Sequence, residues 1–319
     1  MYTSDVEGLD AFAKRYAELK KEIAKVIVGQ EDIVSKLLIS IFCDGHSLLI
    51  GVPGLAKTLT VHTIAEVLDL SFSRIQFTPD LMPSDILGTE LLDETRNFKF
   101  SRGPVFSNIV LADEINRTPP KTQSALLEAM QERSVTVAGQ KHLLPSPFFV
   151  LATQNPIEQE GTYSLPEAQL DRFMFSLNLD YPSVSEEIDV VKSTTSGKKV
   201  TLDKKMTSVE IKYFQDLIKR IPITDNVLEY AVKLTNKTRP NREGSLPRVN
   251  SFIAWGAGPR ASQYLVLGAK CYAASRGKYS PDIEDVKAVA TAVLRHRVFK
   301  NYKAEAEGLS VDQLINELL

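Results

Sequence analysis

The residues that most constrain the fold are the eight from Gly51 to Thr58, which read Gly-Val-Pro-Gly-Leu-Ala-Lys-Thr. They follow an apolar strand-like segment, 47–50, and lead into a helix-like segment, 59–68. A glycine-rich loop between a strand and a helix points backbone N–H groups at a phosphate. The lysine and the hydroxyl that follow complete this kind of site. The sequence therefore predicts a P-loop that binds ATP or ADP.

Individual residues of this loop have expected roles. Lys57 would neutralise the β- and γ-phosphates, and the Thr58 hydroxyl would ligate Mg²⁺. Position 56 is usually glycine in this motif, and alanine resists a positive φ, so Ala56 predicts that the loop enters its helix one residue early. The alternative interpretation is a chance glycine-rich loop. The residues predicted to contact the nucleotide here are Gly51, Val52, Pro53, Gly54, Leu55, Ala56, Lys57, Thr58 and Leu59.

A second motif, 108–114, is an apolar strand that ends in two adjacent carboxylates. Neighbouring side chains of a strand point to opposite faces, but both carboxylates can reach one cleft where the chain leaves the sheet. Asp113 would hold Mg²⁺ through water, and Glu114 would orient and deprotonate the attacking water. A solvated Asp-Glu pair is the alternative, but a position about fifty residues after a P-loop favours a Walker B motif.

A third apolar segment, 148–154, ends in the amide Asn155. If this strand lies between the strand of the P-loop and the strand of the Walker B motif, Asn155 sits beside the γ-phosphate. An amide in that place can hold the attacking water. Asn155 could instead be a turn residue before Pro156, and the sequence alone leaves both interpretations open.

Two arginines are candidates for contact with phosphate. Arg172 precedes the last strand-like segment, and Arg260 falls in the first turn of a helix that Gly258 and Pro259 are expected to open. A cation at a helix N-terminus opposes the helix dipole by several tenths of a kcal/mol. This unfavourable position suggests a role for Arg260 away from its helix. A surface salt bridge is the alternative for either arginine.

The order of elements predicts an α/β fold. Helical or loop segments separate the strand-like ones, so we expect a parallel sheet covered on both faces. The chain divides into a nucleotide-binding core at 1–185, a linker at 186–206 and an all-helical domain at 207–319. The strand-like segments lie at 47–51, 71–77, 108–114, 148–154 and 174–180.

Two hairpins interrupt this plan, at about 89–103 and 135–147. The first has a polar turn at 93–97, and the second has a turn at 138–140. We expect both to project from one face of the sheet; ordinary surface loops are the alternative. Five further features predict helices: an apolar stripe at Phe12, Tyr16, Leu19, Ile23 and Val26, an N-cap at Thr118 before Pro119, capping boxes at Thr207/Glu210 and Ser310/Gln313, and a capped start at Ser280-Pro281.

Composition limits the class of protein. The formal net charge is −2 and the sequence pI is about 6.2, so nothing indicates a dedicated nucleic-acid binder. Cys43 and Cys271 show no metal-ligand spacing and predict reduced thiols in a cytoplasmic protein. The first residues lack the pattern of a signal peptide, and no apolar run approaches the length of a membrane span.

These motifs together resemble those of the MoxR family of AAA+ ATPases, over most of residues 26–300. The family lies in the helix-2-insert clade, with magnesium-chelatase ATPase subunits and MCM helicases. The matching motifs are Val-Gly-Gln at 28–30, Gly-Val-Pro-Gly-Leu-Ala-Lys-Thr at 51–58, Thr-Pro-Asp-Leu-Met-Pro-Ser-Asp at 78–85, Leu-Ala-Asp-Glu-Ile-Asn-Arg at 111–117, Ala-Leu-Leu-Glu-Ala-Met at 125–130, Ala-Thr-Gln-Asn-Pro at 152–156 and Leu-Pro-Glu-Ala-Gln-Leu-Asp-Arg-Phe at 165–173.

The resemblance implies a P-loop core with the strand order 5-1-4-3-2 and a small helical lid. It implies that the hairpins are the helix-2 insert and the pre-sensor-1 hairpin, and that Ala56 before the lysine is usual. It makes Asn155 the sensor 1 residue, Arg172 the arginine finger that acts on a neighbouring subunit's ATP, and Arg260 the sensor 2 residue. The residues expected to border the adenine are Val28, Gly29 and Gln30.

The resemblance also implies a function. The expected form is a ring, a hexamer, that uses ATP to remodel or assemble client proteins, with a von Willebrand factor A domain partner and in some cases for metal-cofactor insertion. The alternatives are a metal-chelatase ATPase subunit, a nucleic-acid translocase and a nucleotide-binding scaffold that does not hydrolyse. The uncharged turn 138–140 disfavours the translocase, because phosphate tracking needs lysine or arginine.

Overall fold

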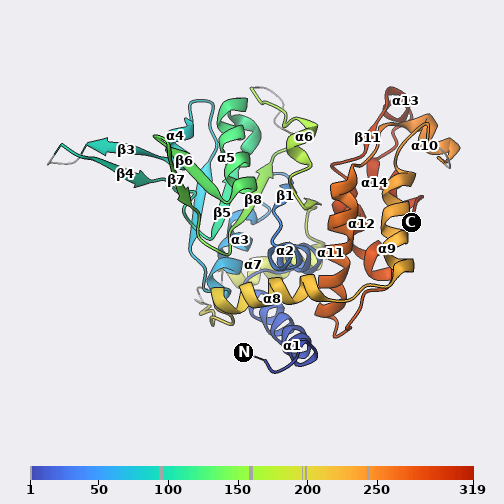
Figure 1. Cartoon of the computed structure of the whole chain (residues 1–319), viewed down its shortest axis with the longest axis horizontal. Coiled ribbons are helices and arrows are strands. Elements are labelled where there is room, and N and C mark those ends of the chain that lie inside the picture. The colour runs from blue at the N-terminus through green and yellow to red at the C-terminus, as the bar shows by residue number, and fades with distance from the viewer. Residues whose placement is uncertain (1, 93–95, 158–160, 196, 198–199, 243–244) are drawn as a thin grey trace.

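The computed structural model describes residues 2–92, 96–157, 161–195, 197, 200–242 and 245–319. Its centre is a parallel five-stranded sheet with the order β2-β5-β8-β1-β9 (Figure 1). The prediction numbers only the five strands of this sheet, so that β1, β2, β5, β8 and β9 are strands 1 to 5. Read from the opposite edge, the observed order is then 5-1-4-3-2, and the prediction is confirmed. The strands are β1 (Ser47–Ile50), β2 (Phe72–Gln76), β5 (Ile109–Asp113), β8 (Phe149–Gln154) and β9 (Phe175–Asn178).

Alternation along the strands supplies two apolar faces. In β5, Leu111 belongs to one buried cluster, whereas Val110 and Ala112 belong to the other. Because both faces are apolar, helices cover both, as the sequence predicts. The first face carries α1 (Asp5–Ile23), α2 (Glu31–Phe42) and α3 (Lys57–Val67), and the second carries α4 (Pro83–Leu87) and α5 (Pro120–Glu132).

The apolar stripe of the first helix is confirmed. Four of its five predicted residues are buried, and the helix ends at Ile23, so Val26 lies beyond it and is half-buried. The ring of Phe12 packs edge-on against Phe42 of α2 and near Phe214 of α8 (Ser208–Arg220). The N-terminal helix therefore joins the core to the C-terminal part of the chain.

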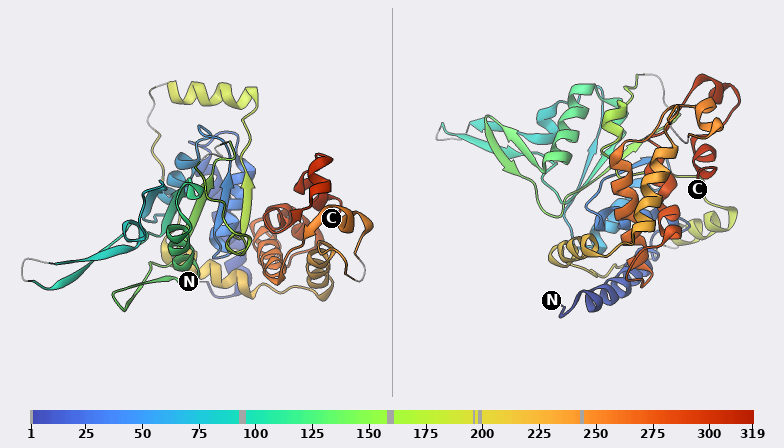
Figure 2. Two further views of the ribbon diagram at one scale, coloured as in Figure 1. Left: turned by 90° about the horizontal axis from the view of Figure 1, so that it is seen from above. Right: turned by 45° about the vertical axis from the view of Figure 1, so that its right-hand side comes forward.

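Both predicted hairpins form, as separate two-stranded sheets that project beyond the main sheet (Figure 2). In the second, Ala138 and Gly139 both have positive φ, which is the two-residue turn typical of hairpins, so Gln140 belongs to a strand and not to the turn. In the first, turn residues 93–95 lie outside the described residues. The strands are β3 (Gly88–Leu92), β4 (Phe98–Arg102), β6 (Ser134–Val137) and β7 (Gln140–Leu143).

The predicted start of α5 is wrong by one residue. Thr118 is extended and fully buried, Pro119 occupies the N-cap position, and the helix begins at Pro120. A residue that precedes proline is disfavoured in the helical region. Since Thr118 and Pro119 each precede a proline, both stay extended. A short 3-10 helix, η1 (Ile115–Arg117), connects β5 to this segment.

A helix, α7 (Val184–Thr195), forms the first half of the segment expected to be a linker at 186–206. Val184, Ile188 and Val191 recur at helical spacing, but no residue of α7 is buried. Figure 2 shows α7 standing off from the sheet. Residues 196, 198 and 199 of the expected connection lie outside the described residues.

The C-terminal part is mainly helical. The capping boxes at Thr207 and Ser310 are confirmed, whereas Asp282 rather than Ser280 caps α12. The prediction of an all-helical domain is wrong in one respect, because β10 (Ile253–Trp255) pairs with β11 (Phe299–Lys300). The other helices of the C-terminal part are α9 (Asp225–Lys237), α10 (Pro247–Phe252), α11 (Pro259–Ser275), α12 (Ile283–Leu294), α13 (Tyr302–Ala306) and α14 (Val311–Asn316). In the core, the short helix α6 (Glu167–Leu170) precedes β9. Within the described ranges, the helices are too short or too polar to cross a membrane.

Candidate functional site

The P-loop leaves the carboxyl end of β1 and enters α3. Gly54 has a φ of +88°, and Ala56 has a φ of +55° and occupies the N-cap position of α3. The expectation that the loop would enter its helix early is therefore wrong, since Ala56 takes the left-handed conformation that glycine usually supplies. This conformation costs an L-residue about 1–2 kcal/mol. Burial of Leu55 and the hydrogen bond from Thr60 N to Ala56 O (2.9 Å) hold it in place.

Four predicted residues meet at the end of this loop. Lys57, Thr58, Asp113 and Glu114 line one pocket of about 430 Å³. Glu114 reaches it because its φ of +57° turns the chain out of the sheet directly after β5. The Lys57 ammonium donates to the carbonyl oxygen of Gly51 at 2.5 Å. Partial burial lowers the pKa of Lys57, and the two carboxylates oppose this shift.

Asp113 is held on both oxygens by protein donors. The Thr153 hydroxyl donates to Asp113 Oδ1 at 2.6 Å and accepts a hydrogen bond from Glu114 N at 2.9 Å. On the other side, Arg74 donates to Asp113 Oδ2 through Nε (3.1 Å) and Nη2 (2.6 Å). Thr153 therefore orients the Asp113 carboxylate and the backbone of Glu114 together.

Glu114 is also held by its neighbours. Gln76 Nε2 donates to Glu114 Oε2 at 2.8 Å, and Arg117 Nη1 donates to the same oxygen at 3.1 Å. The sequence analysis did not identify Arg74, Gln76 or Arg117. Arg74 and Gln76 are two residues apart on β2 and so lie on the same face, and only the pairing of β2 with β5 brings them beside the carboxylates.

The residues at this pocket fit Mg²⁺. The donors are the hydroxyl of Thr58 and the carboxylates of Asp113 and Glu114, all of which are oxygen ligands. In the part of the chain that the structure describes, no group of three or more His, Cys, Asp or Glu side chains could hold a metal ion alone. Mg²⁺ keeps several waters and binds through one or two carboxylates and substrate phosphates, so it does not require such a group.

Asn155 lies at the same edge of the sheet. β8 pairs with β1 on one side and β5 on the other, which is the arrangement on which the sequence interpretation depended. The buried Asn155 follows β8, and its Oδ1 accepts a hydrogen bond from Ile157 N at 3.1 Å. The side chain therefore also stabilises the turn around Pro156.

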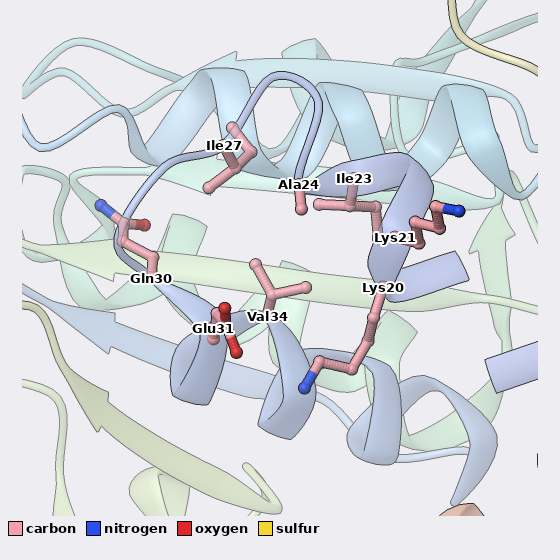
Figure 3. A pocket seen from close by; sticks show the side chains of 8 residues that line it. All are labelled: Lys20, Lys21, Ile23, Ala24, Ile27, Gln30, Glu31 and Val34. Atoms are coloured by element: carbon pink, nitrogen blue, oxygen red, sulfur yellow. The ribbon is translucent and has the colours of Figure 1, made fainter. Parts of the chain in front are cut away.

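The segment Val28–Gln30 connects α1 and α2. Gln30 Nε2 donates to the P-loop carbonyl oxygen of Leu55 at 3.1 Å. Gly29 has a φ of +75° and lies against Glu186 of α7. Figure 3 shows a small pocket of about 160 Å³ beside this segment, which Gln30 shares with residues of both helices. The structure thus joins this segment to the P-loop and to α7.

The two predicted arginines lie in a different pocket, of about 180 Å³. Arg172 and Arg260 line it together with Arg133, which the sequence analysis did not identify. Arg133 donates to Asp44 O at 2.7 Å and Asp44 Oδ1 at 3.1 Å. We call this the arginine pocket; it is lined by Asp44, His46, Met130, Gln131, Arg133, Arg172, Arg260 and Tyr264.

Asp171 connects the arginine pocket to the C-terminal helices. Its Oδ2 accepts a hydrogen bond from Arg260 Nη1 (3.0 Å), and its Oδ1 accepts one from Arg297 Nε (2.7 Å). Arg297 is only 3% exposed and also donates to the carbonyl oxygens of Asp171 and Phe173. A buried arginine with this many acceptors fixes the chain directly before Arg172.

The two pockets lie at opposite edges of the sheet. The P-loop and Asp113 are at the carboxyl ends of β1 and β5, whereas Asp44 and Arg172 precede the amino ends of β1 and β9. These strands are parallel, and a four-residue strand such as β1 spans roughly 13 Å. One copy of the chain therefore does not bring Arg172 or Arg260 to its own P-loop.

Comparisons with known protein families agree with this architecture. Residues 46–175 match the model of the "ATPase family associated with various cellular activities (AAA)", and residues 246–318 match the model of the "AAA lid domain". The first match covers four of the five strands of the central sheet, β1, β2, β5 and β8, and both hairpins. The second covers α10 to α14.

Similar proteins span nearly the whole chain. "Chaperone MoxR1" of Mycobacterium tuberculosis is 43% identical over 98% of this chain and 83% of its own length. "Protein MoxR" of Methylorubrum extorquens is 30% identical over 89% of this chain and 87% of its own. A crystal structure from Cytophaga hutchinsonii, of a protein provisionally assigned as an ATPase, has a TM-score of 0.92 and 44% identity, and covers 98% of this chain and 95% of that one.

Proposed function

This chain belongs to the MoxR family of AAA+ ATPases, and from that premise we propose that it hydrolyses ATP at sites completed between neighbouring copies in a ring. The supporting observation is the separation of the P-loop pocket from the arginine pocket at opposite edges of one sheet. Copies that repeat head to tail around a ring place the arginine pocket of each against the P-loop pocket of the next. Six copies is the number we propose.

Within one copy, the P-loop pocket binds and orients the nucleotide. The backbone of the loop and Lys57 hold the phosphates, Thr58 and Asp113 would hold Mg²⁺, and the segment 28–30 borders the adenine. Bound Mg²⁺ supplies positive charge to the phosphate oxygens. Glu114 takes the proton of the attacking water, and Asn155 orients that water.

The neighbouring copy supplies Arg172 and Arg260. Negative charge spreads over the transferred phosphoryl group in the transition state, and a guanidinium from a neighbour stabilises it. Asp171 holds Arg260 through a salt bridge and fixes the backbone before Arg172 through Arg297. These salt bridges therefore link the C-terminal helical domain, the lid, to the arginines that would contact the ATP of the neighbouring copy.

The work done by the ring is the finer part of the proposal. A relative that bears the name chaperone supports ATP-driven remodelling or assembly of client proteins in the cytoplasm. The two projecting hairpins contact each other through stacked rings of Phe100 and His142, 4.0 Å apart. Because of this contact, a movement of one hairpin would move the other as well. A partner with a von Willebrand factor A domain and a role in metal-cofactor insertion belong to this proposal.

The test mixes two variants that each lack one half of the site. Glu114→Gln keeps the arginines, and Arg172→Ala keeps the P-loop pocket. Each alone should hydrolyse ATP little, but an equal mixture should recover activity, because about a quarter of the interfaces in a randomly mixed ring are complete. A mixture no more active than its components would refute sites shared between copies.

A concentration series gives the same answer without mixing. The hydrolysis rate per subunit should rise with protein concentration as rings form, with Lys57→Ala as the blank. A rate that stays flat while the size of the particles in solution increases would contradict the proposal.

A further inference from the structure

Arg74 is a cation in the P-loop pocket that the Walker motifs do not account for. We propose that Arg74 pairs with Asp113 in the absence of nucleotide, excludes divalent cations from that carboxylate, and transfers to a nucleotide phosphate when nucleotide binds. This inference rests on the proposed function, since it concerns the same site. It assigns Arg74 as a phosphate-binding residue and as the reason that metal and nucleotide enter together.

The geometry places Arg74 across both groups. Arg74 lies on β2, the edge strand of the sheet, two residues before Gln76, which is paired in register with Asp113 of β5. Its side chain extends along the strand, and two nitrogens donate to Asp113 Oδ2 at 3.1 and 2.6 Å. Arg74 also lines the same pocket as Lys57. It can therefore reach either the carboxylate or a phosphate.

The pairing with Asp113 disfavours a metal ion at this carboxylate. Asp113 Oδ1 accepts a hydrogen bond from Thr153, and Oδ2 accepts both hydrogen bonds from Arg74. A divalent cation at Asp113 would also face the positive charge of the guanidinium at hydrogen-bond distance, and like charges that close repel. Arg74 must move before a cation can bind.

The Arg74 side chain is exposed enough to change partners, unlike the buried Arg297 at Asp171. The side chain of Arg74 is 48% exposed, whereas that of Arg297 is 2% exposed. An exposed ion pair is weak because water and salt screen it. Guanidinium groups bind phosphate oxygens through two parallel hydrogen bonds, so a polyphosphate in the pocket is a strong competing partner.

The same movement would reach Glu114. Arg74 Nη2 donates to Gln76 Oε1 at 2.7 Å, and Gln76 Nε2 donates to Glu114 Oε2 at 2.8 Å. Departure of Arg74 removes the donor that orients the Gln76 amide. Arrival of nucleotide is thus coupled to the position of Glu114 by a chain of two hydrogen bonds.

The experiment measures metal and nucleotide binding separately, on the full chain and without turnover. Mn²⁺ alone, followed by electron paramagnetic resonance, reports access to Asp113, and ADP in EDTA, followed by calorimetry, reports phosphate contacts without metal. Arg74→Gln should bind Mn²⁺ about tenfold more tightly than wild type and ADP in EDTA about tenfold more weakly. Adding Asp113→Asn should abolish the gain in Mn²⁺ binding.

A matched control is Arg295→Gln. Arg295 also donates through Nε and Nη2, to the two oxygens of Asp312 at 2.7 and 2.6 Å, but lies outside the P-loop pocket. It should change neither measurement. Arg74→Lys keeps the charge but loses the two-nitrogen geometry of the guanidinium. Its Mn²⁺ binding and its binding of ADP in EDTA should therefore fall between those of wild type and Arg74→Gln. This variant replaces Arg74→Gln in the experiment if Arg74→Gln does not fold.

The outcomes separate this inference from the proposed function. If wild type binds ADP with Mg²⁺ but both Arg74 variants bind Mn²⁺ and metal-free ADP as wild type does, the role of Arg74 is overturned. If wild type binds ADP no better than Lys57→Ala does, the proposed nucleotide site itself is wrong. A gain in Mn²⁺ binding that survives Asp113→Asn would also overturn the inference, because the metal would then bind elsewhere.

Discussion

The P-loop pocket and the arginine pocket hold their charges in different ways. In the P-loop pocket, the Arg74 side chain is half-exposed and shares its donors among a carboxylate and an amide. Beside the arginine pocket, Asp171 is held by a buried Arg297 whose remaining donors are bound to backbone carbonyl oxygens. An exposed pair exchanges partners readily, whereas breaking a buried pair leaves an uncompensated charge. The contacts in the P-loop pocket are therefore suited to change when nucleotide binds, and those beside the arginine pocket are suited to stay fixed.

The largest expected effect removes the arginine finger. Arg172→Ala should lower ATP hydrolysis by about 10³–10⁵-fold, since the neighbouring P-loop pocket loses its transition-state cation. Binding of ATP, measured by calorimetry, should remain, because Arg172 lies at the opposite edge from its own P-loop. Full hydrolysis by this variant would remove the arginine pocket from the mechanism.

The P-loop half should show the complementary result. Glu114→Gln should lower hydrolysis by about 10²–10⁴-fold, as the amide cannot accept the proton of water. Bound ATP should persist and be recovered unhydrolysed after rapid separation from free nucleotide. Normal single-turnover hydrolysis in this variant would show that another group acts as the base.

A smaller effect tests whether Asp171 positions the arginines of the arginine pocket. Asp171→Asn keeps the shape of the side chain but leaves both Arg260 and Arg297 without their anion, and the resulting misplacement should cost about 10²-fold in kcat with little change in ATP binding. An equal mixture with Glu114→Gln should recover activity, because the P-loop pocket of Asp171→Asn is intact.

Asp312→Asn is the control for Asp171→Asn, since it removes a carboxylate–arginine salt bridge, with Arg295, outside both pockets. It should leave kcat unchanged. Equal losses of kcat in the two variants would reduce Asp171 to a general contribution to stability.

Acid should lower the stability of the fold through two buried histidines near the arginine pocket. Burial, helped by Arg133, holds the pKa of His46 well below its usual value, and burial and Arg297 do the same for His296. His46 lines the arginine pocket, and His296 Nε2 lies 2.9 Å from Phe173 O. The unfolded chain binds these protons below about pH 6.5 and the folded chain does not, so stability falls as pH falls through that value.

At pH 5.5 the two histidines together should lower the free energy of unfolding by about 3 kcal/mol relative to neutral pH. Urea unfolding at both pH values measures this. His62→Gln is the control, because the His62 side chain is 57% exposed. A loss of equal size in a variant without His46 and His296 would assign the effect to other groups.

The smallest expected effect concerns the P-loop backbone. Ala56→Gly places at φ +55° the residue that adopts this conformation at no steric cost, so it should raise the free energy of unfolding by up to about 1 kcal/mol. Thermal unfolding without nucleotide measures the change. A clear loss of stability would mean that the methyl group makes a contact worth more than the strain.

Prediction from sequence succeeded where the information is local. The P-loop, the two carboxylates after β5, both hairpins and the capped helix starts at Thr207 and Ser310 depend on residues a few positions apart. It failed where neighbours in space decide the outcome. The left-handed Ala56 is imposed by the packing of Leu55 and α3. The missed helix α7 is different, because its apolar residues recur at helical spacing and so gave a local signal that the prediction did not use.

By itself, the sequence determined which residues could bind phosphate and metal, because loop, lysine, hydroxyl and carboxylates follow one another in order along the strands that carry them. Only the tertiary structure decided how these groups are held and which of them meet. The pairing of β2 with β5 brings Arg74 to Asp113, and the packing of α11 and α12 brings Arg260 and Arg297 to Asp171. These partners lie 39 to 126 residues apart, and no short-range pattern encodes contacts at that separation.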